Sequence, residues 1–266
     1  MLCALRTTDK AKLNARETSK AESPFSCPKC GAEVYIRKGH IKIHHFAHKP
    51  LVICPYGLGE SETHRQAKSA IYERLAQHPK VTHCELEYDL GVVVPDIYAV
   101  IQSTPVAIEV QISNLSLSEI MRRTQHYRQL DIAVLWLPVF DTTLQGERYA
   151  PRAWEKWLHV TYFGRVYYWL ADLTVLPVHF DEYRLSVEGS SWYDEDGEEQ
   201  SGGGYTKPSK RWRTPIFGVS ADIASTFRSG WRNAWQGGVF SVPECILYYD
   251  IQPQWWKKKS RNGFLS

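Results

Sequence analysis

The sequence lacks any long apolar run. No stretch approaches the roughly 18 apolar residues that a membrane-spanning helix requires. Residues 1–20 alternate charged and small side chains, where a signal peptide would have an apolar stretch. We therefore expect a cytoplasmic protein that does not contact a membrane. At 266 residues and 43% hydrophobic, the chain can fold into one large domain or two smaller ones.

Cysteine is also scarce, with six residues in the whole chain. In a reducing compartment, cysteines bind metals or are buried more often than they form disulfides. Cys3, Cys84 and Cys245 each stand alone, and we expect them to be buried as small apolar side chains. Cys27 and Cys30 instead form a CxxC pair, which is typical of a metal site.

A second pair of ligands follows the CxxC pair. The segment His45-Phe46-Ala47-His48, which is separated from Cys30 by fourteen residues, can supply two imidazoles. Tetrahedral zinc prefers such nitrogen and sulfur donors, so we predict a structural zinc site formed by Cys27, Cys30, His45 and His48. Two alternatives stay open: Cys54 can complete a set of three cysteines and one histidine, and His44 can stand in for His45. A closed four-ligand site would stabilise the fold and carry no chemistry.

Charge is distributed unevenly along the chain. Residues 1–50 carry 10 basic and 4 acidic side chains, residues 51–206 carry 12 and 22, and residues 207–266 carry 10 and 3. Basic ends around an acidic centre suit a protein whose ends neutralise phosphates and whose centre holds divalent cations. We therefore expect nucleic acid as the partner. Alternatively, the basic ends are solvent-exposed tails that bind nothing, which would give the same charge distribution.

Apolar periodicity predicts a mixed α/β core over residues 58–150, after an N-terminal module (1–57) with a polar, flexible or loosely helical lead-in at 9–23. Ser61 is a suitable cap and Pro79 a suitable end for a first helix. Helices are expected at 60–78 and 117–130, and strands at 85–88, 92–94, 97–101, 106–110 and 133–137. The last strand is apolar throughout, as expected for burial on both faces.

Residues 151–266 form an aromatic and basic extension. We expect a short helix at 153–158, strands at 160–163 and 166–170, and a flexible insertion at 188–210. Tryptophan and basic residues then alternate, for example at 211–213, 231–235 and 255–259. These residues can stack bases and follow a nucleic-acid backbone. Alternatively they form a small aromatic subdomain on the core, or a surface for protein partners.

A carboxylate pair lies in the predicted core. Asp96 follows Pro95 at the start of one strand, and Glu109 lies on the next strand, with Gln111 on the same face by alternation. If the strands pair, Asp96 and Glu109 converge on one divalent cation, and their hard oxygens suit Mg²⁺ or Mn²⁺. Such a cation can activate water for phosphodiester cleavage.

The order of these motifs resembles that of the competence protein CoiA-like family. The resemblance covers about residues 25–140 and rests on Cys27, Cys30, Gly39, His45-Phe46-Ala47-His48, Glu60-Ser61, His64, Lys68, Asp96, Glu109-Val110-Gln111-Ile112-Ser113 and Arg123-Thr124-Tyr127. It implies a restriction-endonuclease-like mixed sheet flanked by helices, and a PD-(D/E)xK nuclease with DNA as its partner. Asp96 and Glu109 would then be the metal ligands. Gln111 would stand where such nucleases carry a catalytic lysine.

The neutral Gln111 cannot supply the positive charge of a lysine, so another cation is needed or turnover is slow. Lys68 is the candidate, because Glu60, His64 and Lys68 share one helix face at intervals of four residues. Glu60 would add a carboxylate to the metal, and Glu62 is its substitute. Alternatively, these three residues lie on a solvent-exposed helix face without a catalytic role, which would show the same spacing.

Three further residues are expected to contact substrate: His64 on the first helix, and Arg123 and Tyr127 on the second. Tyr127 can instead pack against the sheet. The sequence thus predicts a metal-dependent nuclease. The alternatives are a nucleic-acid-binding module that has lost cleavage, for which Gln111 is the reason, and a zinc-dependent interaction protein.

Overall fold

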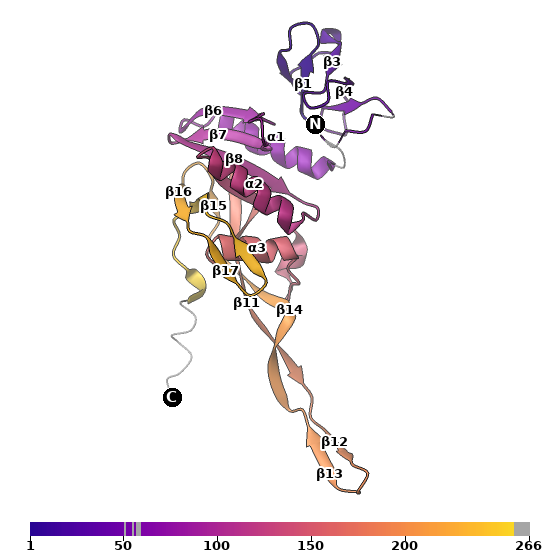
Figure 1. Ribbon diagram of the computed structural model, residues 1–266, viewed down its shortest axis with the longest axis vertical. Helices are drawn as coiled ribbons and strands as arrows, with labels where there is room; N and C mark the ends of the chain where they lie inside the picture. The colour runs from indigo at the N-terminus through magenta and orange to yellow at the C-terminus, as the bar shows by residue number, and fades with distance from the viewer. Residues whose placement is uncertain (51, 55, 57–59, 258–266) are drawn as a thin grey trace.

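The chain forms a small N-terminal sheet module, a mixed α/β core and a projecting β-arm (Figure 1). The computed structural model describes residues 1–50, 52–54, 56 and 60–257. The boundary expected between residues 57 and 58 lies outside the described residues, as do residues 258 and 259 of the last basic run. None of the helices in the described part of the chain is long and apolar enough to cross a membrane.

The N-terminal module is a five-stranded antiparallel sheet in the order β2-β1-β3-β4-β5. Its strands are β1 (Cys3–Arg6), β2 (Lys12–Asn14), β3 (Phe25–Ser26), β4 (Glu33–Arg37) and β5 (His45–His48). Phe25 and Phe46 pack edge to face at 5.2 Å in a small core of the module's own. The polar lead-in is more regular than expected, because β2 and a 3-10 turn at Lys20–Glu22 run through it.

The central sheet is mixed and has six strands in the order β16-β19-β9-β8-β7-β6. Antiparallel pairs join β6 to β7 and β7 to β8, whereas β8 and β9 are parallel. The bounds are β6 (Val81–Leu86), β7 (Ile97–Ile101), β8 (Thr104–Gln111), β9 (Ala133–Pro138), β16 (Phe227–Arg232) and β19 (Cys245–Asp250). The predicted mixed α/β core is therefore confirmed, with β9 buried along its whole length.

Three α-helices pack around this sheet: α1 (Glu62–Ala76), α2 (Leu117–Gln129) and α3 (Ala153–Thr161). Ser61 caps α1 as expected, since its side chain accepts from the His64 amide at 3.1 Å. Trp136 of β9 donates its indole N–H to Thr124 of α2 at 3.1 Å. Glu109 is level with Trp136 in the parallel register, so both project from the face that α2 covers.

Two expected strands are wrong. Val92–Val94 forms part of the connection between β6 and β7, because Gly91 turns the chain at φ +83° and the Leu90 amide bonds to the Val93 carbonyl at 3.1 Å. Residues 160 and 161 end α3, and residues 162 and 163 form the turn that follows it, so no strand forms at 160–163. The Tyr162 amide donates to the Leu158 carbonyl at 2.8 Å, and its buried ring packs in the core.

The C-terminal extension is built into the core. β19 lies parallel to β9, and β10 (Val166–Ala171) contributes the buried Tyr167 and Tyr168 to the same core. Trp154 and Trp157 of α3 are buried, whereas Trp231 is 48% exposed beneath the guanidinium of Arg128. The aromatic residues of the extension therefore divide between core packing and the surface.

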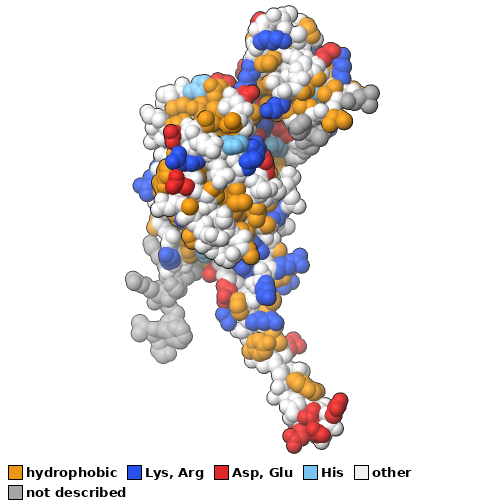
Figure 2. Space-filling model, viewed as in Figure 1, with side chains coloured by type: hydrophobic (Ala, Val, Ile, Leu, Met, Phe, Trp, Pro, Cys, Tyr) orange, Lys and Arg blue, Asp and Glu red, His pale blue; other side chains and the backbone are white. Residues whose placement is uncertain are grey.

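A long β-arm replaces the flexible insertion expected at 188–210 (Figure 1). β11 (Thr174–Val187) pairs with β14 (Tyr205–Phe217), and β12 (Ser190–Tyr193) pairs with β13 (Glu199–Gly202) at the tip. The backbone pairing of these strands continues to the tip, where the Asp194 side chain closes the turn by accepting from the amides of Asp196 and Glu198. Acidic side chains gather at the tip and basic ones along the stem (Figure 2). The remaining strands are β15 (Ala221–Asp222), β17 (Trp235–Gly237) and β18 (Phe240–Val242).

Candidate functional site

A group of sulfur and nitrogen donors lies at one end of the N-terminal module. The ligand atoms of Cys27, Cys30, His48 and Cys54 all lie within 4.8 Å of one another. Cys30 Sγ is 3.3 Å from His48 Nε2, and the Lys29 amide donates to Cys27 Sγ at 3.4 Å. Three thiols and one imidazole on short loops suit tetrahedral zinc. The module therefore holds a possible metal site of three cysteines and one histidine.

This set is the alternative that included Cys54, and His45 is not part of it. The His45 ring is turned away, with Nδ1 2.8 Å from the Ile43 carbonyl oxygen. Burial lowers the pKa of His45. Successive residues of β5 face opposite sides, and His45 and His48 are an odd number of residues apart, so only one of them faces the cysteines.

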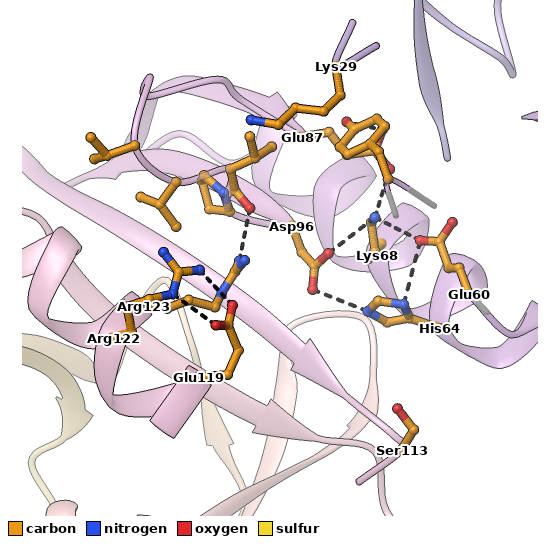
Figure 3. A pocket seen from close by; sticks show the side chains of 15 residues that line it. Lys29, Glu60, His64, Lys68, Glu87, Asp96, Ser113, Glu119, Arg122 and Arg123 are labelled. Carbon is orange, nitrogen blue, oxygen red and sulfur yellow. Dashed lines mark hydrogen bonds and ion pairs between the residues drawn. The ribbon is translucent and has the colours of Figure 1, made fainter. Parts of the chain in front are cut away.

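The second candidate site is a cavity of ≈ 510 Å³ between the module, α1, α2 and the start of β7. Its charged lining is rich in both signs (Figure 3). The acidic side chains are Glu60, Glu87, Asp96 and Glu119, and the basic ones are Lys29, Lys68, Arg122 and Arg123, with His64 beside them. His64 and Lys68 lie one turn apart on α1, whereas Glu60 precedes the cap residue Ser61 and so lies outside the helix that was expected to include it. Its carboxylate still lies 2.8 Å from the Lys68 ammonium.

Lys68 lies at the centre of three carboxylates. Its ammonium is 2.8 Å from Glu60, 2.7 Å from Glu87 and 3.2 Å from Asp96, and its side chain is 3% exposed. Burial alone would lower the pKa of Lys68, but the three carboxylates outweigh it and raise the pKa well above its usual range. Lys68 therefore stays charged and neutralises the carboxylates around it.

Asp96 joins the α1 residues to the sheet. Its Oδ2 accepts from the Val110 amide at 2.9 Å and lies 3.1 Å from His64 Nε2. Burial would raise the pKa of Asp96, but Lys68 and His64 hold it well below its usual range. For His64, burial would lower the pKa, but the neighbouring Asp96 outweighs it and raises the pKa. The carboxylate is thus ionised and 17% exposed, facing the cavity.

Glu109 lies opposite Asp96 in the strand register, because Ile97 pairs with Ile108. Its side chain is buried behind Arg123 and does not line the cavity. Arg123 Nε donates to Glu109 Oε1 at 2.9 Å, and the Tyr127 hydroxyl donates to the same oxygen. Burial raises the pKa of Glu109, with Arg123 opposing that effect.

Of the three expected substrate contacts and Gln111, only two line the cavity. Arg123 and His64 line the cavity, whereas Tyr127 is fully buried, which matches the packing alternative. Gln111 is turned from the cavity and donates to the Ser113 carbonyl at 2.5 Å. Glu62, the substitute for Glu60, points to the module, accepting from the Ile43 amide at 2.6 Å.

Glu87 is a residue of the site that sequence reasoning missed. Its carboxylate accepts from the amides of Leu2 and Cys3 at 2.9 and 3.0 Å and from the Tyr56 hydroxyl at 2.9 Å, besides bonding Lys68. Burial opposes its charge, yet Lys68 and the N-terminal amine lower the pKa of Glu87 to about 2. Leu2 and Cys3 lie more than 80 positions from Glu87, and Tyr56 and Lys68 lie 31 and 19 positions away, so no local spacing could reveal it.

Two family models match consecutive parts of the chain. The family model for the competence protein CoiA N-terminal domain matches residues 6–57, and that for the CoiA nuclease-like domain matches residues 60–158. The competence protein CoiA of Bacillus subtilis (strain 168) is 28% identical over 127 residues, which are 47% of this chain and 34% of the relative. The match thus spans about a third of that relative's length. No solved structure matches the chain.

Both CoiA domains are matched in chain order, and together they contain the cysteine and histidine group and the carboxylate cavity. Neither match extends past residue 158, so β11, β14 and the rest of the C-terminal extension lie outside them. The chain belongs to the competence protein CoiA-like family, with a nuclease-like domain as its core.

Proposed function

We propose that the chain is a metal-dependent nuclease that cleaves phosphodiester bonds of DNA, with a core of the PD-(D/E)xK type. One observation carries the proposal. Asp96, opposite Glu109 in the strand register, presents an ionised carboxylate to an open cavity whose rim carries Lys29 and Arg122. A carboxylate that can bind a cation thus lies beside side chains that can bind a phosphate.

The carboxylate of Asp96 in the cavity and that of Glu109 buried behind Arg123 have the hard oxygen donors that suit a divalent cation. Asp96 and Glu109 would hold Mg²⁺ or Mn²⁺, which lowers the pKa of water and stabilises charge on a phosphate. Glu60 would add a third carboxylate. His64 fixes the orientation of Asp96 through the bond to Oδ2. Because Arg123 is bonded to Glu109, occupation of this site requires Arg123 to release that carboxylate.

A second cavity supports nucleic acid as the partner. It has a volume of ≈ 790 Å³ and lies between the β4–β5 hairpin and α1. Its lining includes no acidic side chain and five basic ones, which are Lys20, Arg37, Lys38, Lys42 and Arg65. Lys and Arg side chains are also visible on the module and on the stem of the β-arm (Figure 2). Such surfaces bind the phosphate backbone in a salt-dependent manner.

A second candidate function is a nucleic-acid-binding module without cleavage. Lys68 and Arg123 favour this alternative, because these two cationic side chains already neutralise the carboxylates that a metal ion would use. The neutral Gln111 favours it as well. In this alternative the cavity binds a phosphate through its basic rim, and the carboxylates only hold Lys68 and Arg123 in place.

Incubation of the zinc-loaded protein with plasmid and with linear single-stranded DNA distinguishes the two. We expect cuts with Mg²⁺ or Mn²⁺ and none without them. Asp96→Ala and Glu109→Gln should abolish cutting and retain DNA binding. Glu147→Ala, which changes an exposed carboxylate that does not line the cavity, is the matched control and should cut normally. Binding without cuts by the wild-type protein would establish the second function instead.

A further inference from the structure

The cations of the carboxylate cavity differ in how they are engaged. Lys68 is held by three carboxylates, and Arg123 by Glu109 and the Val94 carbonyl. Arg122 forms a two-point ion pair with Glu119, at 2.8 and 2.7 Å. Lys29 is exposed, and within the described part of the chain no hydrogen bond or ion pair engages its ammonium.

Lys29 reaches the cavity from the N-terminal module, not from the nuclease-like core. Figure 3 shows its side chain extending along the rim above Asp96, on the side of the cavity away from His64. An ammonium in this position is available to an incoming phosphate. The ammonium of Lys68 is not, because its side chain is buried beneath the carboxylates that bind it.

The backbone of Lys29 is fixed by the metal-binding loop. Lys29 lies between Cys27 and Cys30, and its amide donates to Cys27 Sγ at 3.4 Å. The Gly31 amide donates to the Cys27 carbonyl at 2.9 Å, which closes the turn. A metal on both sulfurs would hold this loop in one conformation. A metal in the module would therefore fix the backbone from which the Lys29 side chain extends to the rim.

The module is in turn docked beside the cavity. Glu87 accepts from the amides of Leu2 and Cys3, and Lys12 donates to the Leu86 carbonyl at 2.6 Å and to the Glu87 carbonyl at 3.0 Å. These contacts set the orientation of the metal-binding loop relative to Asp96. The position of Lys29 on the rim thus follows from contacts made at the edge of the same cavity.

We infer that Lys29 contacts a phosphate of the bound nucleic acid, so that the zinc module completes the binding site of the nuclease-like core. The inference rests on the proposed function only in that nucleic acid occupies this cavity. Lys29 supplies a cation that Gln111 cannot supply and that Lys68 cannot bring to the substrate. It positions the phosphate beside Asp96, and the zinc site acts on substrate binding through it.

The test is the affinity of the full chain for a labelled single-stranded or double-stranded DNA oligonucleotide, measured by fluorescence anisotropy at several salt concentrations without added Mg²⁺. We expect Lys29→Ala to weaken binding about three- to tenfold and to lower the salt slope by about 0.7 to 0.9, the value for one phosphate contact. Lys29→Arg should retain most of the affinity. Lys10→Ala, an exposed lysine of the same module on the β1–β2 turn, is the control and should bind normally.

Zinc depletion tests the coupling. In zinc-depleted protein, Lys29→Ala should have no further effect, because the loop no longer holds the side chain at the rim. Equal affinity and salt slope for zinc-loaded wild type and Lys29→Ala would overturn the inference, as would an equal loss with and without zinc. If wild type never cuts DNA but Lys29→Ala still weakens binding, cleavage fails and the inference stands.

Discussion

Replacement of Arg123 by methionine tests whether the cavity can bind a divalent cation. The substitution leaves Glu109, which is 3% exposed, without the guanidinium that pairs with it, while Tyr127 still donates to Oε1. Breaking a buried ion pair by removing one partner costs about 3–5 kcal/mol. The Val94 carbonyl also loses its donor. We expect a melting temperature lower by about 6–20 °C, at about 2–4 °C for each kcal/mol in a chain of this size.

The assay is thermal unfolding of zinc-loaded protein at pH 7, followed by circular dichroism. Arg123→Met combined with Glu109→Gln should recover part of the loss, because a neutral amide needs no counterion. Arg122→Met is the control. Its ion pair with Glu119 is exposed and should contribute about 0–1 kcal/mol. Added Mg²⁺ or Mn²⁺ should stabilise Arg123→Met more than wild type, since Glu109 is then free to bind it.

Two results would refute this reasoning. If Arg123→Met has the same melting temperature as the wild type, the ion pair with Glu109 contributes nothing measurable to stability. The buried carboxylate is then protonated at little cost. If Mg²⁺ and Mn²⁺ shift both proteins equally, Glu109 does not take part in cation binding. The second result would favour a nucleic-acid-binding module over a nuclease.

Three further predictions concern the zinc site, Gln111 and pH. Elemental analysis should find about one zinc per chain; His48→Ala and Cys54→Ser should lower that content, and His45→Ala should not. Gln111→Lys should raise the rate of metal-dependent cutting, measured on plasmid, because it restores a charge for the transition state; an unchanged rate would place residue 111 outside the reaction. The pKa of Glu87 is lowered to about 2 from its usual 4.5, so its stabilising contribution is present above pH 4.5 and lost as pH falls toward 2. Urea unfolding between these pH values should show a weaker pH dependence for Glu87→Gln.

Local patterns predicted most of the elements of the core. Ser61 and the apolar spacing that follows it placed α1 to within two residues at each end, and α2 and β9 were predicted equally well. The errors arose where short apolar runs are ambiguous. Residues 160–163 have the composition of a strand, but the helix that begins at Ala153 continues through Thr161 and residues 162 and 163 form the turn after it.

The pairing of strands that lie far apart in the chain could not be predicted from the sequence. Nothing near Cys245 indicates that β19 lies beside β9, since the two strands are separated by more than 100 residues and by a complete β-arm. The alternation of Trp and Arg in this region is equally compatible with core and surface. Tertiary packing, not local composition, decided that Trp157 is buried and Trp231 is half exposed.

The candidate site divides in the same way. The register of Asp96 and Glu109 follows from the strand pattern, and the structure brings these residues level. The ion pair between Glu109 and Arg123 was not predicted, because spacing cannot show which of several nearby groups a buried carboxylate selects. The choice between His45 and Cys54 depended on which face of β5 meets the CxxC loop.

Glu87 explains why the two matched domains need each other. Its carboxylate receives the amides of Leu2 and Cys3 and the Tyr56 hydroxyl from the module side, and the Lys68 ammonium from α1. A nuclease-like core without the module would lose three of the donors to Glu87, the two amides and the Tyr56 hydroxyl, and would keep Lys68 alone. The contacts that dock the module are therefore the ones that fix Lys68 among the carboxylates. Any change that loosens the module also alters the charge balance around Asp96, so the module and the cavity respond as one unit.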